Sequence, residues 1–246
     1  PELDPKNVIR ECCDSEEHPN TRPVILALDV TGSMGGASVK VAKELNVIMT
    51  ELYGKVKDVE FLIMGIGDLA YDSAPIQASQ FESDIRIAEQ LDKIYFEGGG
   101  GGNSFESYTA AWYFGLNHCK LDCWERGKKG IIITLGDEPL NPYLPSYKLS
   151  SVTGDKLQGD VETGDLYREV SQQYDVYHLA IADRETSYRI YADKIKASFG
   201  KYLDENHLKV VNMDSLASAI VGIVVNSEES TSTGTVYTDE NGAISW

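Results

Sequence analysis

Three oxygen-bearing side chains stand on alternate positions directly after an apolar run. The run is Val24–Leu28, and Asp29, Thr31 and Ser33 follow it. Five consecutive apolar residues predict a strand that is buried on both faces. In an open α/β sheet, ligands bind outside the carboxyl ends of the strands. Because a carboxylate and two hydroxyls are hard oxygen donors, the stretch predicts a site for a magnesium-like cation rather than for zinc.

Two later loops carry further oxygen donors. Asn103, Ser104 and Glu106 follow the glycine run 98–102, and Asp137 follows the end of a later stretch, Gly130–Leu135, that predicts another fully buried strand. An amide oxygen such as that of Asn103 can ligate Mg²⁺ or Ca²⁺, and the hydroxyl of Ser104 is the alternative donor in this loop. The carboxylate of Asp137 supplies a second negative charge for a bound dication. These loops therefore extend the candidate metal site beyond the first motif.

Some of these residues also have a purely structural interpretation. Asp29 and Ser33 can cap the helix that is predicted to begin near Ser38, a role that is compatible with binding a cation. Glu106 can ligate the ion or support its ligands, or it can act as a capping-box partner that reaches back to the backbone of Asn103. The sequence leaves both roles of Glu106 open.

Apolar runs and helical stripes alternate along most of the chain, which predicts strands and helices in turn. The predicted strands are Val24–Leu28, Val59–Ile66, Gly130–Leu135, Val176–Ala182 and His207–Val211, with an edge strand within Tyr71–Phe81. The predicted helices are Val39–Tyr53, Asp84–Ile94, Phe105–Cys119, Leu166–Tyr174, Tyr188–Phe199 and Leu216–Val225. This alternation predicts an α/β fold: a three-layer, doubly wound (Rossmann-like), mostly parallel six-stranded sheet with one antiparallel edge strand and helices on both faces.

The composition of the flanking segments predicts three regions. Residues 1–22 form a polar leader that packs on the domain or stays loose, residues 23–226 form one domain, and residues 227–246 form a Ser/Thr/Gly-rich tail or terminal hairpin. Within the domain, residues 139–162 predict a long insertion, here called the excursion, at the carboxyl edge of the sheet. Insertions of this length are usually functional or face a partner. Because loops after central strands converge at that edge, we expect the three donor-bearing loops to meet there.

The three loops resemble those of von Willebrand factor type A (vWA) domains, in order, spacing and structural context over nearly the whole chain. Asp29-x-Thr31-x-Ser33 resembles the Asp-x-Ser/Thr-x-Ser motif of their metal-ion-dependent adhesion site (MIDAS). The run Gly100-Gly-Gly-Asn103-Ser-Phe-Glu106 departs from the usual Gly-Gly-Thr turn and is similar to a Gly-Gly-Gly-Asp-x-Pro-Glu subgroup, with Asn103 at the Asp position. In that subgroup the third loop reads Asp-x-Pro, as do residues 137–139.

The resemblance to intracellular, bacterial-type vWA domains implies a non-enzymatic function. By it, Thr31 and Ser33 ligate Mg²⁺ (or Mn²⁺ or Ca²⁺) directly, and Asp29 and Asp137 bind the ion directly or through water. Asn103 completes the protein ligands, with Ser104 and Glu106 as less certain members of the site. A carboxylate of a partner protein fills the remaining position. For intracellular relatives, the resemblance implies an AAA+ ATPase or a multiprotein assembly as partner.

Charge and cysteine usage restrict the partners and the compartment. The 246 residues carry a formal net charge of −17, which disfavours nucleic acid and anionic membrane surfaces as partners. No apolar stretch reaches the ~20 residues of a membrane span, and the first residues lack the pattern of a secretory signal. The four cysteines have no zinc-finger spacing and are expected to be free thiols in a reducing cytoplasm.

Two other functions compete with that of a metal-dependent binding domain. Because Asn103 departs from the usual motif, the chain could instead be a vWA scaffold that binds no metal and has a purely structural role in a multiprotein assembly. A Mg²⁺-dependent phosphohydrolase of haloacid-dehalogenase type also places an Asp after its first strand. That chemistry needs a carboxylate two residues later as general acid, where this chain has Thr31. It also needs a lysine near a later strand end, whereas Lys128 and Lys129 precede their strand.

Overall fold

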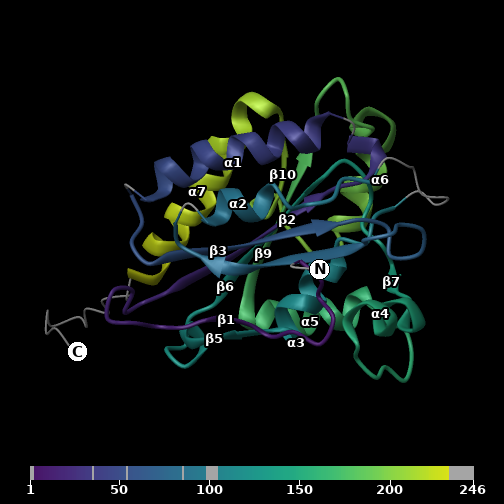
Figure 1. Ribbon diagram of the computed structural model, residues 1–246. Helices are drawn as coiled ribbons and strands as arrows, with labels where there is room; N and C mark the ends of the chain where they lie inside the picture. The colour runs from purple at the N-terminus through teal and green to yellow at the C-terminus, as the bar shows by residue number, and fades with distance from the viewer. Residues whose placement is uncertain (1–2, 35, 54, 85, 98–104, 233–246) are drawn as a thin grey trace, which may run out of the picture.

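The computed structural model describes residues 3–34, 36–53, 55–84, 86–97 and 105–232. Its central strands are β2 (Arg22–Asp29), β3 (Val59–Ile66), β4 (Ile76–Glu82), β6 (Gly130–Gly136), β9 (Tyr174–Ile181) and β10 (Leu208–Val211). They form one six-stranded sheet in the order β10-β9-β6-β2-β3-β4, in which only the edge strand β4 is antiparallel to its neighbour (Figure 1). The predicted sheet is therefore confirmed.

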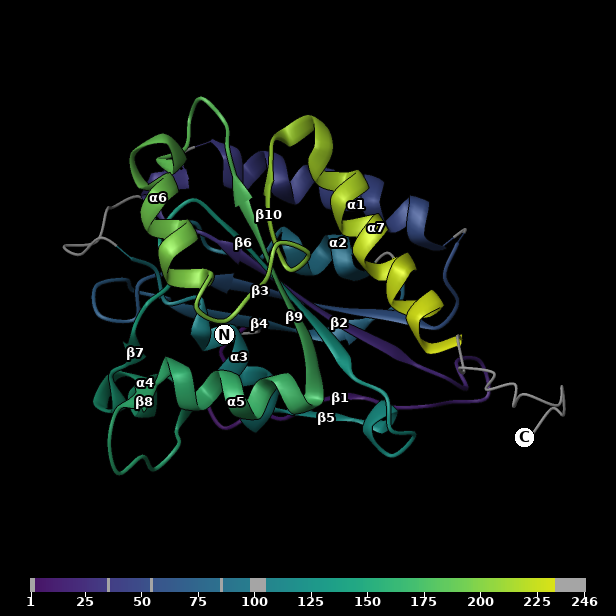
Figure 2. The same ribbon diagram turned by 180° about the vertical axis from the view of Figure 1, so that it is seen from behind.

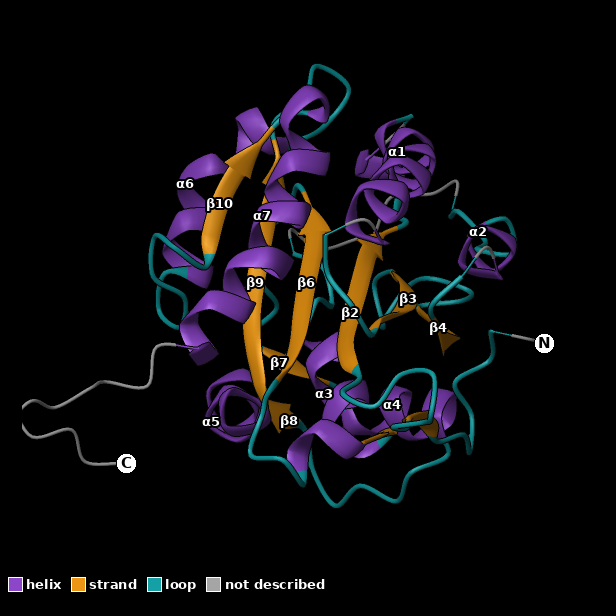
Figure 3. Ribbon diagram, turned by 90° about the vertical axis from the view of Figure 1, so that its left-hand side faces the viewer, coloured by secondary structure: helices purple, strands orange, loops and turns teal. Residues whose placement is uncertain are grey.

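Helices cover both faces of this sheet (Figure 3). The helices are α1 (Ala37–Tyr53), α2 (Arg86–Leu91), α3 (Thr109–Asn117), α5 (Thr163–Gln173), α6 (Tyr188–Phe199) and α7 (Met213–Ser232). One apolar cluster contains Val24, Leu26 and Leu28 of β2 with residues of α1, α2 and α7, and the other contains Ile25 and Ala27 with residues of α3, α5 and α6. Alternate residues of β2 thus face opposite layers, as its unbroken apolar run predicts.

The register of the central strands places the candidate loops together. Leu28 is paired with Leu135 across β2 and β6, which are parallel neighbours. Asp29 therefore leaves the sheet beside Gly136, and Asp137 follows one residue later. On the other side of β2, Asp29 is paired with Ile66 of β3. The sheet alone thus brings the first and third candidate loops to the same edge.

The N-terminal segment is packed on the domain. Strand β1 (Arg10–Cys12) pairs in parallel with β5 (Cys119–Leu121). Further upstream, the Leu3 carbonyl accepts a hydrogen bond from the Ala78 N–H at 2.9 Å, and Arg10 donates to the Ala78 carbonyl at 3.0 Å. The segment therefore covers part of the outer edge of β4 and satisfies backbone groups there.

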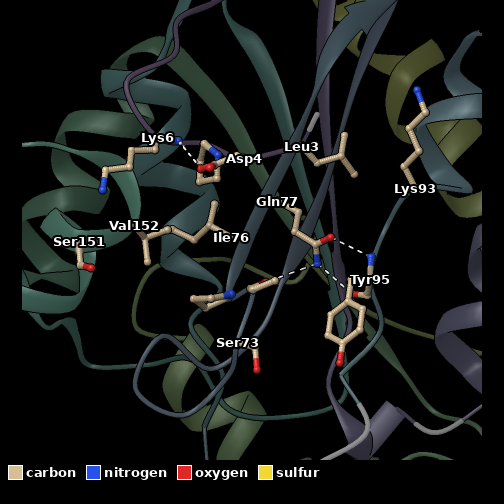
Figure 4. A pocket seen from close by; sticks show the side chains of 13 residues that line it. Leu3, Asp4, Lys6, Ser73, Ile76, Gln77, Lys93, Tyr95, Ser151 and Val152 are labelled. Carbon is tan, nitrogen blue, oxygen red and sulfur yellow. Dashed lines mark hydrogen bonds between the residues drawn. The ribbon is translucent and has the colours of Figure 1, made fainter. Parts of the chain in front are cut away.

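A pocket of about 800 Å³ lies between the N-terminal segment and the start of β4 (Figure 4). Its wall is fixed by Gln77, whose side chain donates to the Tyr95 carbonyl at 2.9 Å and accepts from the Tyr95 N–H at 2.8 Å. These bonds tie β4 to the segment that follows α2. Of the residues predicted to bind the metal, those that the structure describes do not line this pocket.

The excursion 139–162 is structured rather than irregular (Figure 2). It contains a two-stranded pair, β7 (Tyr143–Leu144) with β8 (Val161–Glu162), and helix α4 (Ser146–Thr153) between them. Helix α4 ends at Gly154, whose φ of +88° is in the left-handed region that glycine adopts without strain. Leu144 and Leu149 are fully buried and join the cluster beneath α3 and α5, so the excursion is part of the core.

Several expected boundaries were wrong. The helix predicted over Phe105–Cys119 spans only Thr109–Asn117, because Cys119 belongs to the small β1–β5 sheet. Cys123 lies in a separate 3-10 helix, Asp122–Trp124. Helix α7 continues to Ser232, and the hairpin proposed for the tail lies outside the described residues. Within the described ranges, no helix is both long and apolar enough to cross a bilayer.

A buried polar cluster fastens the excursion to the rest of the molecule. His118 hydrogen-bonds through Nδ1 to the Val8 carbonyl at 2.8 Å and through Nε2 to Asp155 at 2.7 Å. The Tyr113 hydroxyl donates to the same carboxylate at 2.5 Å. Although burial opposes ionisation, the bonds from Tyr113 and His118 hold the pKa of Asp155 below its usual value. The His118 imidazole thus connects the N-terminal segment at Val8 with the excursion at Asp155.

Replacing His118 by alanine is expected to destabilise the protein by about 3 kcal/mol, because Asp155 and the Val8 carbonyl lose a buried partner. Urea denaturation measures the change. The matched control is His207→Ala, since His207 makes a similar 2.7 Å contact with Asp204 at an exposed position. That change is expected to cost less than about 1 kcal/mol. Equal losses in the two variants would contradict the assigned role of His118.

Candidate functional site

Four side chains from two loops place their oxygens in a continuous series of close contacts at the carboxyl edge of the sheet. The Thr31 hydroxyl donates to Asp29 Oδ1 at 2.6 Å and lies 3.0 Å from the Ser33 hydroxyl. Ser33 in turn donates to Asp137 Oδ1 at 3.0 Å. Asp29 and Asp137, 108 residues apart in the sequence, are therefore joined through only two hydroxyl groups. The structure brings together four of the five main residues that were predicted to bind metal.

Asp29 is fully buried and held from both sides of its carboxylate. Oδ1 accepts from the Thr31 backbone N–H as well as from its hydroxyl, and Oδ2 accepts from the Tyr108 hydroxyl at 2.6 Å. Burial, with a further contribution from the negative charge of Asp137, raises the pKa of Asp29 to about 7. The carboxylate is therefore fixed in orientation, but its ionised form is disfavoured without a nearby positive charge.

The third loop adds two more carboxyl groups. Asp137 is fully buried, and its Oδ2 accepts from the Ser187 backbone N–H just before helix α6 at 2.5 Å. Burial raises the pKa of Asp137 despite that bond. Burial and the neighbouring Asp137 also raise the pKa of Glu138 to about 7, although an interaction with the Ser33 hydroxyl opposes the rise. Glu138 therefore lies beside Ser33 and Asp137 and adds a carboxyl group to the site.

The second loop contributes Glu106, a buried carboxyl group with an unpartnered oxygen. Glu106 is only 2% exposed, and its Oε2 has no hydrogen-bond partner among the described residues. Burial, with smaller contributions in decreasing order from the negative charges of Asp29, Glu138 and Asp68, raises the pKa of Glu106 to about 11. The capping-box interpretation of Glu106 is wrong, because α3 begins only at Thr109 and the Glu106 backbone instead bridges to Leu140.

Two predicted donors, Asn103 and Ser104, lie outside the described residues. Within the residues that the structure describes, no group of three or more His, Cys, Asp or Glu side chains has the arrangement of a metal site. The assembled donors are instead a mixed set of carboxylates and hydroxyls. Such hard oxygen donors suit Mg²⁺, Mn²⁺ or Ca²⁺. The unpartnered Glu106 oxygen shows that the site has a buried acceptor to spare, so the residues present fit a cation.

Comparisons with known proteins bear on the fold. The vWF domain of the type V pili tip protein Mfa5 from Porphyromonas gingivalis superposes with a TM-score of 0.51 at 12% identity, covering 88% of this chain and 98% of that one. BatB, a conserved hypothetical protein from Bacteroides thetaiotaomicron, gives 0.50 at 15% identity, covering 85% and 99%. The chain has a von Willebrand factor type A (vWA) fold.

A third structure with this vWA fold is much longer than the chain. The pilus adhesin SpaC from Lactobacillus rhamnosus GG, in its open conformation, gives a TM-score of 0.55 at 13% identity. It covers 91% of this chain, but the chain spans only 31% of SpaC. No family model matches the sequence, and no curated protein matches it. At these identities the structures show the vWA fold alone.

Tyr108 is the main residue at this edge of the vWA fold that sequence reasoning missed. Its fully buried ring packs edge-on against His178, with ring centroids 5.0 Å apart, and its hydroxyl reaches Asp29. A β-carbon at position 136 would overlap that hydroxyl, so Gly136 leaves the space that Tyr108 occupies. Nothing in the sequence distinguishes Tyr108 from the other aromatic residues of its segment, and only its position directly before α3 places its hydroxyl against Asp29. Tyr108 therefore positions Asp29.

Replacing Tyr108 by phenylalanine is expected to lower both stability and Mg²⁺ affinity. The change leaves Asp29 Oδ2 without its buried donor, at a cost of about 1–3 kcal/mol, and frees the carboxylate to rotate. The control is Tyr174→Phe, because Tyr174 is equally buried and donates to the Gly115 carbonyl, far from the site. Calorimetry with Mg²⁺ is expected to show a loss of about tenfold for Tyr108→Phe and no loss for Tyr174→Phe. An unchanged Mg²⁺ affinity in Tyr108→Phe would contradict this role.

Proposed function

We propose that this chain is a non-enzymatic protein-binding domain that holds a divalent cation and recruits an acidic side chain of a partner protein to it. Thr31 and Ser33 ligate the ion through their hydroxyls, and Asp29 and Asp137 bind it directly or through water. The second loop adds Asn103 or Ser104, with Glu106 as an additional carboxylate. Mg²⁺ is the proposed ion, with Mn²⁺ and Ca²⁺ as substitutes.

The spacing of the four linked oxygens is the observation that supports this proposal. Consecutive oxygens from Asp29 to Asp137 are 2.6, 3.0 and 3.0 Å apart. Adjacent ligands of an octahedral Mg²⁺, each about 2.0–2.1 Å from the ion, are about 2.9 Å apart. The spacing between neighbouring oxygens is thus compatible with ligands of a single ion, and rotation of the hydroxyls would exchange their hydrogen bonds to the aspartates for bonds to that ion.

The electrostatics of the site favour a cation as well. Asp29, Asp137 and Glu138 are three carboxyl groups whose pKa values are raised by burial and, for Asp29 and Glu138, by the charge of Asp137. A bound dication reverses this effect and favours the ionised forms. When Asp29 and Asp137 are ionised and Glu138 and Glu106 keep the protons that their burial favours, the two ligand charges only balance the ion. Its hydroxyl and water ligands add no negative charge, so a further carboxylate can still bind. A partner that offers Asp or Glu therefore fits the remaining position.

A comparison of protein capture with and without metal tests the proposal. The immobilised chain is expected to retain a partner from cell extract in Mg²⁺ and to release it in EDTA, and Asp137→Asn is expected to abolish capture. Asp183→Asn is the matched control, since Asp183 follows the end of β9 by two residues and its carboxylate accepts a local hydrogen bond from the Arg184 N–H. The proposal is wrong if capture is the same in Mg²⁺ and EDTA. Mass spectrometry of the captured protein also tests the AAA+ ATPase that the vWA resemblance implies.

A vWA scaffold that binds no metal is the second candidate. It is favoured by one observation: within the described ranges the Thr31 and Ser33 hydroxyls already donate to the two aspartates, and no group of three or more His, Cys, Asp or Glu side chains has the arrangement of a metal site. The scaffold would associate with its partners through surfaces that do not involve Asp29 or Asp137. Calorimetric titration of metal-stripped protein separates the two, because the scaffold gives no heat with either Mg²⁺ or Mn²⁺.

The placement of the lysines and of Thr31 supports a function without hydrolysis. A haloacid-dehalogenase-type hydrolase needs a general acid where Thr31 stands, and the Thr31 hydroxyl is donated to Asp29. Such chemistry also needs a lysine at the carboxyl edge, whereas Lys128 and Lys129 precede β6 and lie at the opposite edge. Release of phosphate from a generic phosphate ester in Mg²⁺ would overturn this part of the proposal.

The cysteines support a reducing compartment such as the cytoplasm. All four are free thiols; Cys12, Cys119 and Cys123 are buried, and Cys13 is exposed. Burial raises the pKa values of Cys119 and Cys123, to about 12 and about 11, so these thiols are unreactive at neutral pH. Cell fractionation tests this location, and recovery of the chain in an extracellular or surface fraction would contradict it.

A further inference from the structure

A pocket of about 590 Å³ lies at the amino edge of the sheet, opposite the candidate metal site. It is formed where β2, β6 and β9 begin and where α7 passes the start of β2 (Figures 1 and 2). Its volume is within the range of about 300–1,000 Å³ that is usual for small-molecule sites. Neither the vWA fold nor the proposed metal site assigns a role to this pocket.

The lining of the pocket is strongly cationic, in contrast to the rest of the chain. Arg22, Arg126, Lys128 and Lys129 line it, and Asp175 is the acidic residue among the lining side chains. The whole chain has only 22 lysines and arginines and a net charge of −17, so this concentration of positive charge is not a consequence of composition. Cations held this close repel one another, and a bound anion would relieve that repulsion.

The two arginines are held in place by the protein. The Arg22 guanidinium donates to the Ser227 hydroxyl at 2.6 Å, and burial lowers its pKa. The Arg126 guanidinium forms an ion pair with Asp14 and donates to the Thr21 carbonyl at 2.8 Å. Both cations are therefore positioned before any ligand arrives, which reduces the entropy that binding would cost.

The two lysines are available to an incoming ligand. Lys129 is 3.4 Å from Asp175, and both side chains are more than 40% exposed, so this pair contributes little and is easily exchanged. Lys128 is exposed and forms no ion pair with any residue that the structure describes. Fixed guanidinium groups beside adaptable ammonium groups are the combination that suits the several oxygens of a phosphate group.

We propose that this pocket binds an organic phosphate. A phosphate carries more charge and more acceptor oxygens than a single carboxylate, in keeping with a pocket lined by four basic residues, two of which are paired with Asp14 and Asp175. Pro23 and Ile131 line the same cavity and give the organic part of the ligand an apolar surface. An acidic protein partner is less well suited, because it would extend beyond the pocket onto an acidic surface, whereas a small ligand responds to the local charge.

Calorimetric titration of the full chain with ADP and with inorganic pyrophosphate tests the proposal. Both titrations contain EDTA, so that no cation can bridge a phosphate to the candidate metal site. ADP is expected to bind and to raise the melting temperature, and Lys128→Gln/Lys129→Gln is expected to weaken ADP binding at least about tenfold. The control Lys43→Gln/Lys57→Gln removes the same charge from two exposed lysines outside the pocket and is expected to leave ADP binding unchanged.

The remaining outcomes are equally decisive. Tighter binding of ADP than of pyrophosphate supports a ligand with an organic group. Equal binding of the two would overturn the proposal of an organic ligand, because the pocket would then be a site for inorganic phosphate. Absence of binding by either probe overturns the proposal, as does an equal loss in the pocket and control variants. Binding of hexaglutamate without binding of either phosphate would also overturn it, because the surface would then recognise an acidic peptide.

Discussion

A chain in which Asp29 is replaced by asparagine is expected to bind Mg²⁺ about a hundredfold more weakly than the unchanged chain. Asparagine keeps the size of the side chain but removes the negative charge of Asp29, one of the two carboxylates, with Asp137, that accept from the Thr31 and Ser33 hydroxyls. Loss of a buried charged partner costs on the order of 3 kcal/mol, which corresponds to that change in affinity. Calorimetric titration of metal-stripped protein measures it.

The stability of the same variant separates a lost ligand from a lost fold. Ionised Asp29 is disfavoured by burial and by Asp137, so its neutral replacement relieves a repulsion while losing one acceptor. The free energy of unfolding without metal is therefore expected to change little at neutral pH. Asp183→Asn, also at the end of a parallel strand, is expected to leave both quantities unchanged. Full Mg²⁺ affinity in Asp29→Asn would contradict the proposed ligand set.

The second large effect is a loss of stability in the metal-free protein as the pH rises from about 4 to about 7. Asp29 and Glu138 have folded-state pKa values of about 7, and that of Asp137 is raised as well. In the unfolded chain these groups titrate near pH 4. Between the two values the folded state binds more protons, so each group lowers the free energy of unfolding by up to about 1.4 kcal/mol per pH unit.

Mg²⁺ is expected to reverse this trend. Because metal binding requires ionised carboxylates, the gain in stability on adding Mg²⁺ should be small near pH 5 and large near pH 8. Urea denaturation at both pH values, in EDTA and in Mg²⁺, measures the four free energies. The double variant Asp29→Asn/Asp137→Asn should show a flatter pH profile and no response to Mg²⁺. A metal-free stability that is constant or rises over this range would contradict the account.

The central sheet was predictable because its strands are buried on both faces. Val59–Ile66 matches β3 at both ends, and Gly130–Leu135 differs from β6 by one residue. Such continuous apolar runs carry a strong signal. The short strands β1, β5, β7 and β8 were missed, because two- and three-residue strands have no periodicity and their pairing is decided by tertiary contacts. The N-terminal segment is ordered by the edge of β4, which no local pattern reveals.

The candidate site was predictable in part for a related reason. Asp29, Thr31, Ser33 and Asp137 follow strands whose order and register bring them together. The hydrogen bonds from the Tyr108 hydroxyl to Asp29 and from the Ser187 N–H to Asp137 were not predictable. The partners lie 79 and 50 residues apart in the sequence, and neither a tyrosine nor a serine indicates a binding site by its residue type. Glu106 was assigned two roles, and only the late start of α3 at Thr109 excludes capping.

A crystal of the metal-stripped chain soaked in Mn²⁺, with anomalous diffraction recorded at the manganese edge, tests the central claim most directly. The account predicts one strong anomalous peak at the carboxyl edge of the sheet, within bonding distance of Thr31 Oγ1 and Ser33 Oγ and beside the carboxylates of Asp29 and Asp137. Absence of a peak there, with the loops ordered and Mn²⁺ in excess, would contradict it.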